Sequence, residues 1–233
     1  MPSILITGAS RGFGRALADE YIERGWTIFP LLRSREMASE ISRTAGYRCF
    51  PIIGDVTSAD IEEKIVSVLG KHTEALDVLI NNAGNIKKAR GFEGANHEDM
   101  EEHFKVHCIG AFRCVRASIE FLKKSVKPVI VNISSRRGSI SGTVTGELPR
   151  IYAYNIAKAA QNMLTACLSV DLRQYGIKVF AVHPGRLKTE VAPADADVEP
   201  RAAAAKLADW IDRTDENTPV GLNNLIESGL IEW

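Results

Sequence analysis

Short apolar runs alternate along the chain with longer segments whose hydrophobic residues recur at helical spacing. Six runs are typical of buried strands, at residues 3–6, 27–31, 48–52, 76–80, 129–133 and 179–183. Each is followed by a segment that predicts a helix. Strands joined through helices pair in parallel by right-handed crossovers, and the helices cover both sheet faces. The pattern predicts an α/β fold with a doubly wound parallel sheet.

Pro30 conflicts with this pattern because it lies inside the second apolar run. Proline has no backbone N–H and removes one donor from the hydrogen-bond ladder of a sheet. We therefore expect Pro30 at the last turn of pairing of its strand.

The length and composition fit one domain. The chain has 233 residues, 45% of them hydrophobic, which is enough for one buried core and too little for a nucleotide domain with a separate substrate domain. No repeat, charge block or linker interrupts the pattern. We expect residues 1–233 to form a single domain.

Charge and cysteine content exclude several classes of protein. Lysine plus arginine (29) equals aspartate plus glutamate (29), so bulk charge does not favour nucleic acid or a membrane surface. The cysteines have no metal-ligand spacing, and no metal is expected; they are Cys49, Cys108, Cys114 and Cys167. No apolar segment is long enough for a membrane span or typical of a signal peptide. These features predict a cytoplasmic protein.

A glycine-rich segment follows the first apolar run directly. Residues 7–14 read TGASRGFG and precede a predicted helix at residues 15–23. Gly8 allows a sharp turn, Gly12 allows the backbone to approach a pyrophosphate, and Gly14 allows close packing of helix on sheet. The loop also contains Ser10, Arg11 and Phe13, and the helix start offers N–H groups to an anion. The segment predicts a nucleotide-binding cradle of the Rossmann type.

A tyrosine and a lysine stand four positions apart in a long predicted helix, residues 151–174. Tyr154 and Lys158 therefore project from the same helix face. A lysine beside a tyrosine stabilises the phenolate and lowers the pKa of the phenol toward neutrality, where it exchanges protons readily. The pair predicts acid–base chemistry, although helices also carry such pairs by chance.

Together these motifs resemble the short-chain dehydrogenase/reductase family over essentially the whole chain. The resemblance includes, in order, TGASRGFG, Asn81-Asn82-Ala83-Gly84, Ser135, the Tyr154/Lys158 pair, and Pro184-Gly185 with Thr189. The segments YNIAKAAQNM, HPG and the final GLIEW are similar to the carbonyl reductase branch that includes bacterial C-factor and insect sniffer. The resemblance implies an NADP-dependent oxidoreductase that moves a hydride between nicotinamide and a carbonyl/alcohol substrate.

The same resemblance implies roles for individual residues. Tyr154 would be the general acid/base, Lys158 would also hold the nicotinamide ribose, and Ser135 would donate to the substrate oxygen. The residues expected to contact the cofactor elsewhere are Asp55 and Val56 at the adenine, Asn82, Ala83 and Gly84 at its ribose, and Pro184, Gly185, Leu187 and Thr189 near the carboxamide. Asp55 could instead cap the helix that starts near Ser58.

His107 departs from the family pattern, which has an asparagine at this position that kinks its helix. A histidine can keep the kink and its backbone carbonyl as a passive substitute. Alternatively, its ring adds a group that titrates near pH 6.5.

Two arginines predict the choice of cofactor. Arg33 stands where an acidic residue would select NAD, and Arg11 precedes Gly12, where NADP-using relatives are often basic. Both could instead be solvated surface charges. We expect NADP.

Other arginines follow strand ends or precede the catalytic helix, so they can gather at one crevice. Arg137, Arg150 and Arg186 are candidates for an anionic substrate, with Arg186 the first choice. Solvated loop charges are the alternative. The long loop at residues 138–150 is expected to form part of the substrate wall.

Two other functions use parts of the same machinery. A nucleotide-sensing signalling or interaction protein needs only the cradle, and a sugar epimerase or dehydratase usually needs a larger C-terminal domain. We expect an enzyme with a small-molecule substrate, no nucleic-acid or membrane partner, and a homo-oligomeric state, either dimer or tetramer.

Overall fold

A central sheet organises the molecule. The structure, a computed structural model, describes residues 1–87, 89–190, 192 and 196–233. The strands have the order β3-β2-β1-β4-β5-β6-β7-β8, and all neighbours are parallel except β7 and β8. Their bounds are β1 Ser3–Thr7, β2 Thr27–Leu32, β3 Ile52–Ile53, β4 Val78–Asn81, β5 Val129–Ile133, β6 Lys178–His183, β7 Leu222–Asn224 and β8 Leu230–Ile231.

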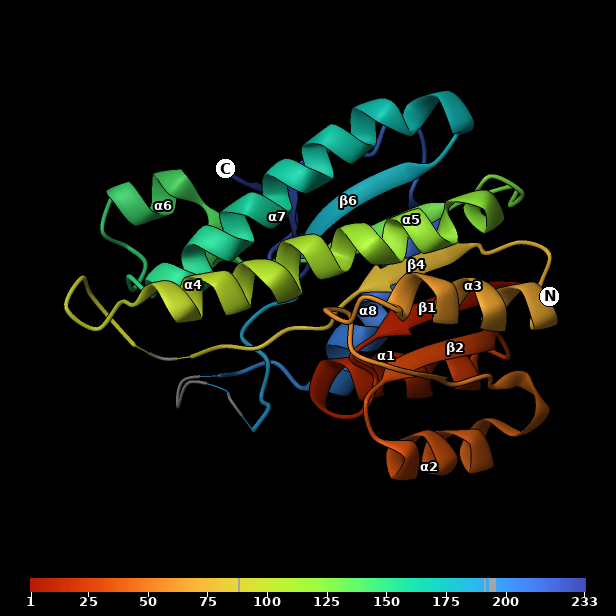
Figure 1. The fold of residues 1–233 in the computed structure, drawn as a ribbon. Helices are drawn as coiled ribbons and strands as arrows, with labels where there is room; N and C mark the ends of the chain where they lie inside the picture. Colours follow the sequence, from red (N-terminus) through yellow and green to blue (C-terminus); the bar gives the residue numbers. More distant parts are fainter. Residues whose placement is uncertain (88, 191, 193–195) are drawn as a thin grey trace.

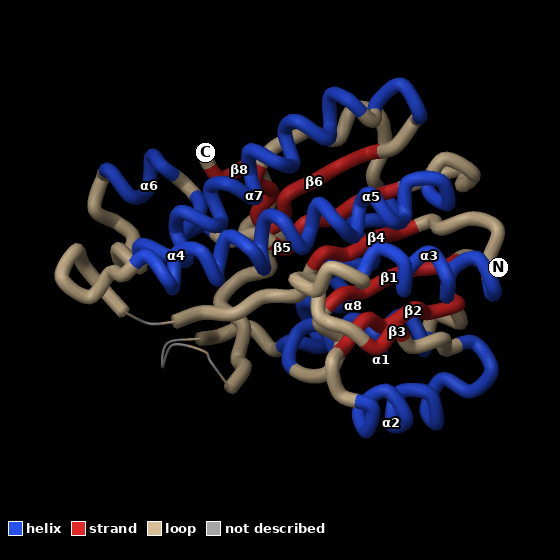
Figure 2. Tube along the Cα trace, in the orientation of Figure 1, coloured by secondary structure: helices blue, strands red, loops and turns tan. Residues whose placement is uncertain are grey.

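Helices cover both faces of the sheet (Figures 1 and 2). One face carries α1 Gly12–Glu23, α2 Arg35–Ala45 and α8 Pro200–Arg213, and the other carries α3 Ile61–His72, α4 His97–Phe104, α5 Ala111–Leu122 and α7 Tyr152–Asp171. The connecting pieces are η1 Gly46–Arg48, η2 Lys105–Gly110, η3 Arg136–Gly138, α6 Ile140–Val144 and η4 Arg173–Tyr175. This arrangement confirms the α/β fold with a doubly wound sheet. Within the described residues, no helix combines the length and apolar character that crossing a membrane requires.

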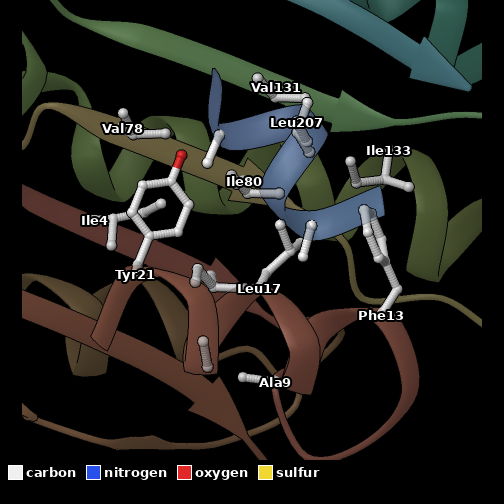
Figure 3. Packing of buried hydrophobic residues seen from close by; sticks show 14 of the residues in the cluster. Ile4, Ala9, Phe13, Leu17, Tyr21, Val78, Ile80, Val131, Ile133 and Leu207 are labelled. Atoms are coloured by element: carbon white, nitrogen blue, oxygen red, sulfur yellow. The ribbon is translucent and has the colours of Figure 1, made fainter. Parts of the chain in front are cut away.

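The sheet is buried on both faces because successive side chains of a strand point in opposite directions. Figure 3 shows Ile4 of β1 and Ile80 of β4 packed with Leu17 and Tyr21 of α1 and with Leu207 of α8. The intervening side chains of the same strands belong to a second cluster on the other face, under α3, α5 and α7. The continuous apolar runs in the sequence follow from this two-sided burial.

The third strand was predicted wrongly. Residues 46–48 form the 3₁₀ helix η1, and β3 contains only Ile52 and Ile53. Pairing with β2 consists of a bridge between Ile28 and Cys49 and resumes only between Leu31 and Ile52. The interruption lies opposite Pro30, which has no N–H to donate.

Pro30 itself lies in the interior of β2 and not at its last turn of pairing, so that prediction was also wrong. Phe50 N donates to Ile28 O at 3.0 Å, so the Ile28 backbone faces the β3 side. Since backbone groups two residues apart face the same side, the missing donor of Pro30 also faces β3. On the opposite side β1 pairs with β2 through Leu31 without interruption. Pro30 therefore interrupts only the pairing of β2 with β3, the edge strand of the sheet.

The chain continues past the six predicted strands into β7 and the antiparallel β8. Both are too short to show a pattern in the sequence. The final residues bond to α6, because Ser141 N donates to Trp233 O at 3.3 Å and Ser141 Oγ donates to Glu232 at 2.9 Å. The C-terminal residues therefore contact the segment that precedes α7.

Gly14 in α1 has no space for a side chain. A Cβ there would lie 2.1 Å from Gly8 O and 2.5 Å from Asn82 Nδ2. We expect Gly14→Ala to lower the free energy of unfolding by about 2 kcal/mol or more, because backbone must move to admit the methyl group. Urea denaturation of the purified protein measures this change.

Gly70 provides the matched control, since it lies in α3 and its Cβ would approach nothing nearer than Phe121 Cζ at 3.9 Å. Gly70→Ala should stabilise the protein by about 0.5 to 1 kcal/mol through helix propensity. Equal effects of the two substitutions would show that the α1–β1 approach is not tight.

Candidate active site

The predicted functional segments meet at one edge of the sheet. Each follows the carboxyl end of a parallel strand, and the first residues after the six strands include Gly8, Arg33, Asp55, Asn82, Ser135 and Pro184. In open α/β sheets, ligands bind at this edge. The fold therefore brings the predicted cradle and the predicted catalytic residues to the same side.

The glycine loop is held by the segment after β4. Asn82 Nδ2 donates to Thr7 O at 2.9 Å and to Gly8 O at 3.3 Å. Thr7 Oγ1 accepts from the backbone N–H groups of Asn82 and Ala83, both at 2.9 Å. Gly8 has a φ of 69°, and a Cβ at Gly8 would lie 2.8 Å from Ala83 Cα. Only glycine fits this turn.

The loop leaves the start of α1 open to an anion. Arg11 is the N-cap with an extended backbone, its side chain makes no capping hydrogen bond, and no acid lies in the first turn. The first N–H groups of a helix need an acceptor. Across the loop, a Cβ on Gly12 would lie 3.4 Å from Thr189 Cγ2. Ser10 is half-buried beside this opening, and Phe13 is buried in the core. A side chain at residue 12 would therefore contact Thr189, whereas glycine leaves the uncapped N–H groups at the start of α1 accessible to a pyrophosphate.

The far end of the cradle contains an arginine–aspartate pair. Arg33 Nη1 lies 3.5 Å from Asp55 Oδ2. Burial raises the pKa of the Asp55 carboxyl, but hydrogen bonds from Thr57 and the charge of Arg33 outweigh it, so the net pKa shift is downward. Asp55 Oδ1 accepts from Thr57 N and Thr57 Oγ1 at 2.9 and 2.7 Å. The alternative of a helix cap is wrong, since α3 begins at Ile61 with Asp60 as N-cap.

The remaining cofactor candidates surround the same cradle. Arg11 Nη1 pairs with Glu190 at 2.7 Å, with both side chains about 70% exposed. Val56 is buried, and a Cβ on Gly110 would lie 2.7 Å from Val56 Cγ2. Gly185 has a φ of 94°, and Leu187 forms a bridge with Val198. The strand order places the loops after β3 and β6 on opposite sides of the glycine loop that follows β1.

Ser135, Tyr154 and Lys158 come together as predicted. Tyr154 and Lys158 lie one turn apart on α7, with Lys158 Nζ 5.7 Å from the centre of the tyrosine ring. Ser135 follows β5 and lies close enough to Tyr154 to lower the pKa of its phenol. Lys158 is 4% exposed, and its Nζ donates to Ile133 O at 2.6 Å. A phenol, a hydroxyl and a buried amine thus share one site.

The pKa values of these groups differ from the expectation. Burial raises the pKa of Tyr154, and the hydrogen bond to Ser135 and the charge of Arg137 only partly oppose it. Burial also lowers the pKa of Lys158 to about 7. The prediction that Lys158 lowers the pKa of Tyr154 toward neutrality is therefore wrong for the protein groups by themselves, because removal from water is the larger effect.

His107 lies in an irregular part of its helix. Residues 105–110 form the π-helix η2, a local distortion that is frequent at functional sites. His107 Nε2 lies 2.9 Å from Asn85 O, so Nε2 carries the proton, since a carbonyl oxygen only accepts. Among the described residues, Nδ1 has no hydrogen-bond partner, and the ring centre is 5.5 Å from that of Tyr154. Burial holds the pKa of His107 well below its usual value. The ring is therefore neutral at pH 6.5, against the alternative that it titrates there.

The three substrate arginines have different surroundings. Arg186 Nη2 pairs with Asp197 at 2.5 Å, so this first choice already has a carboxylate partner. Arg137 Nη1 donates to Pro149 O at 3.3 Å, and its charge acts on Tyr154. Arg150 lines a surface cleft with Arg90 and residues 146–149. Arg137 is the member of this set whose charge affects the pKa of Tyr154.

Sequence reasoning missed two buried polar residues beside the site. Gln161 is 1% exposed and accepts from Lys158 Nζ at 2.9 Å. His103 is fully buried, accepts from Lys87 N at 3.2 Å, and its ring centre lies 6.4 Å from that of Tyr154. Helical spacing was the available signal, since Gln161 is three residues after Lys158 and His103 four before His107.

Comparison with known proteins agrees with this architecture. The sequence profile of the short chain dehydrogenase family matches residues 2–199. An uncharacterized oxidoreductase of Thermotoga maritima is 34% identical over 202 residues, which are 84% of this chain and 76% of the relative. A cyclopentanol dehydrogenase of a Comamonas species is 29% identical over 208 residues, which are 88% of this chain and 80% of that protein.

Solved structures of carbonyl reductases have the same fold over their whole length. The NADPH-bound carbonyl reductase from chicken fatty liver has a TM-score of 0.90 and 28% identity, covering 100% of this chain and 99% of the other. Carbonyl reductase Sniffer of Drosophila melanogaster has a TM-score of 0.91 and 26% identity, with 100% of both chains covered. The resemblance inferred from the motifs is confirmed: the chain is an oxidoreductase that belongs to the short chain dehydrogenase family.

Proposed function

We propose that this oxidoreductase is an NADP-dependent carbonyl reductase with Tyr154 as general acid. The observation that carries the proposal is the meeting of Ser135, Tyr154 and Lys158 at the strand edge that also presents the glycine cradle. The carbonyl reductases with the same fold support the reaction class. A nucleotide sensor would need the cradle alone, so the buried catalytic group favours an enzyme.

The protein groups supply what a hydride donor lacks. NADPH, when bound, provides the hydride, and the carbonyl oxygen of the substrate then becomes an oxyanion that needs a proton. The raised pKa of Tyr154 keeps its hydroxyl protonated at neutral pH, so Oη can donate that proton. Ser135 Oγ would donate a hydrogen bond to the same oxygen and stabilise the developing charge.

Lys158 would have two roles in this reaction. Its pKa of about 7 allows it to pass a proton toward Tyr154 near neutral pH. Two of its N–H bonds are directed to Ile133 O and Gln161 Oε1, which leaves one for the nicotinamide ribose hydroxyls. His107 would act as a passive substitute for the family asparagine and retain the distorted helix.

The cofactor would lie along the carboxyl edge of the sheet. Its pyrophosphate would bind the N–H groups around Gly12, with Asp55 and Val56 at the adenine and Asn82, Ala83 and Gly84 at the adenine ribose. The nicotinamide end would contact Pro184, Gly185, Leu187 and Thr189. Arg11 and Arg33 would bind the 2′-phosphate, because their present partners are exposed or distant carboxylates. Exposed ion pairs contribute only about 0 to 1 kcal/mol, so a phosphate competes easily.

The first test concerns the proton donor. We expect Tyr154→Phe to lower kcat by about 10² or more, because the phenylalanine ring keeps the shape and loses the acid. NADPH affinity, measured by fluorescence titration, should stay near that of the wild type. A variant with nearly normal kcat would refute the assigned mechanism.

Lys158→Met is the companion variant for the same test. It should reduce both kcat and NADPH affinity, because Lys158 is assigned a proton role and a ribose role. Loss of rate with unchanged affinity would remove the ribose contact from the proposal.

The second test concerns the choice of cofactor. Arg33→Asp should shift the preference toward NADH, because a charge-assisted hydrogen bond to the 2′-phosphate is worth about 1.5 to 3 kcal/mol. The measurement is the ratio of kcat/KM for NADPH and NADH. Arg43→Asp makes the same charge change at the exposed end of α2 and should leave the ratio unchanged. Equal affinity of the wild type for both cofactors would contradict the assignment.

We further propose an anionic substrate, such as a keto acid, oriented by Arg137. Its position two residues after Ser135 and its charge on Tyr154 support this choice over Arg150 and Arg186. In a chain of zero net charge, a local cation can steer a carboxylate toward the site.

The third test compares a keto acid with its methyl ester. The acid should have the higher kcat/KM by about tenfold at low salt, since one charge-assisted contact is worth about 1.5 kcal/mol or more. Added salt should reduce this preference, and Arg137→Ala should remove most of it while Arg43→Ala has no effect. If the ester reacts as well as the acid at low salt, the substrate is not selected by charge.

A further inference from the structure

Gln161 is a polar side chain in the interior that contacts the buried lysine directly. Its side-chain oxygen accepts from Lys158 Nζ at 2.9 Å, and Nζ also donates to Ile133 O at 2.6 Å. Both acceptors are uncharged. They fix two of the three N–H bonds of the ammonium group, so the direction of the third is determined by the protein.

The backbone of Gln161 is tied to the sheet by a buried polar ladder. Thr165 Oγ1 donates to Gln161 O at 2.8 Å and accepts from Asn132 Nδ2 at 2.8 Å. Asn81 Nδ2 in turn donates to Asn132 Oδ1 at 2.8 Å. The ladder connects β4 and β5 to α7 through side chains that are at most 3% exposed. It therefore holds the Gln161 backbone without using the amide, whose oxygen remains for Lys158.

Lys158 lies among groups that do not balance its charge. The titratable groups whose electrostatic effects connect them to this site are Tyr154 on α7, His103 and His107 on α4 and η2, His183 on β6, and Arg136 and Arg137 after β5. Within the described part of the chain, no Asp or Glu makes an ion pair with Lys158, and burial is the one resolved cause of its pKa shift. A buried cation without a carboxylate depends on hydrogen-bond acceptors for its charged form.

We propose that Gln161 is a positioning residue for Lys158, whose amide oxygen stabilises the charged form of the lysine and fixes the direction of Nζ. The effect on turnover rests on the proposed function, whereas the effect on Lys158 itself does not. If Gln161 only fills space, variants of similar size should leave the Lys158 titration unchanged, because packing depends on the volume at residue 161 and not on the charge of the acceptor.

Two substitutions of similar size separate these roles. Gln161→Leu removes the acceptor, so the Lys158 titration should move to lower pH by about one unit or more. Gln161→Glu keeps the shape and adds a negative charge, so the titration should move to higher pH. Ser169→Ala removes a buried hydroxyl of α7 that donates to Ala166 O at 2.7 Å, and should leave the titration unchanged.

The direct measurement is NMR titration of the full-length protein labelled with ¹³C at lysine Cε, with the Lys158 signal assigned by its loss in Lys158→Met. The same variants are then assayed for NADPH oxidation across pH. The alkaline limb of kcat/KM should move down for Gln161→Leu and up for Gln161→Glu, because protonated Lys158 is the active form in reduction.

Opposite shifts in the NMR titration support the proposal, even for an inactive preparation, in which case only the proposed function fails. Shifts of the same sign, or none, overturn it. If Gln161→Leu does not fold, the Gln161→Glu variant alone decides the question. An upward shift of the Lys158 titration supports the proposal, and an unchanged titration excludes an electrostatic contact and overturns it.

Discussion

The parallel pairing of β1 with β2 on one side and β4 on the other determines where chemistry is possible in this molecule. Parallel strands end at the same edge, so every loop that follows a strand meets the others there. The close approach of Gly14 to Gly8 O then sets the distance between α1 and the sheet. Asn82, which follows β4, donates to the backbone of this turn. The glycine loop is therefore fixed by contacts within the protein.

Removal from water is the second determinant of the site. It raises the pKa of Tyr154 and lowers the pKa values of Lys158, His107 and His183, so each shift favours the neutral form. The protein meets the cost of burial with neutral acceptors, namely backbone carbonyls and the Gln161 amide. Among the described residues, hydrogen bonds to neutral groups, and not a buried carboxylate, therefore stabilise the Lys158 ammonium.

The sequence predicted the strands correctly where a continuous apolar run reflects burial of the strand on both faces of the sheet. Val129–Ile133 forms β5 as expected, because its four apolar side chains pack in the two cores, one on each face of the sheet. Prediction failed for β3, because its length depends on a residue of another strand. Pro30 lies in β2, and its missing N–H interrupts the pairing of the β3 segment with β2. The glycine loop, Asn82 and Ser135 could be placed at one edge of the sheet because each follows a strand, whereas Tyr154 and Lys158 could be paired by their helical spacing.

The pKa directions and the contact with Gln161 could not be found in this way. Burial is a property of the packed structure, and the sequence shows only that a tyrosine and a lysine share a helix face. Gln161 occupies an interior position that hydropathy assigns to the surface. Its partner becomes evident only when the lysine is placed between β5 and α7.

The short edges of the sheet have a consequence for the protein in a crowded solution. The outermost strands, β3 and β8, contain two residues each, and Pro51 directly precedes β3. An edge strand with many free N–H and C=O groups is a template for strands of other molecules. Here the long apolar strands are all internal, and the edges offer few groups to a neighbour. Pro30, which interrupts the pairing between β2 and β3 and so shortens this edge, thus helps to protect a hydrophobic sheet from growth into aggregates.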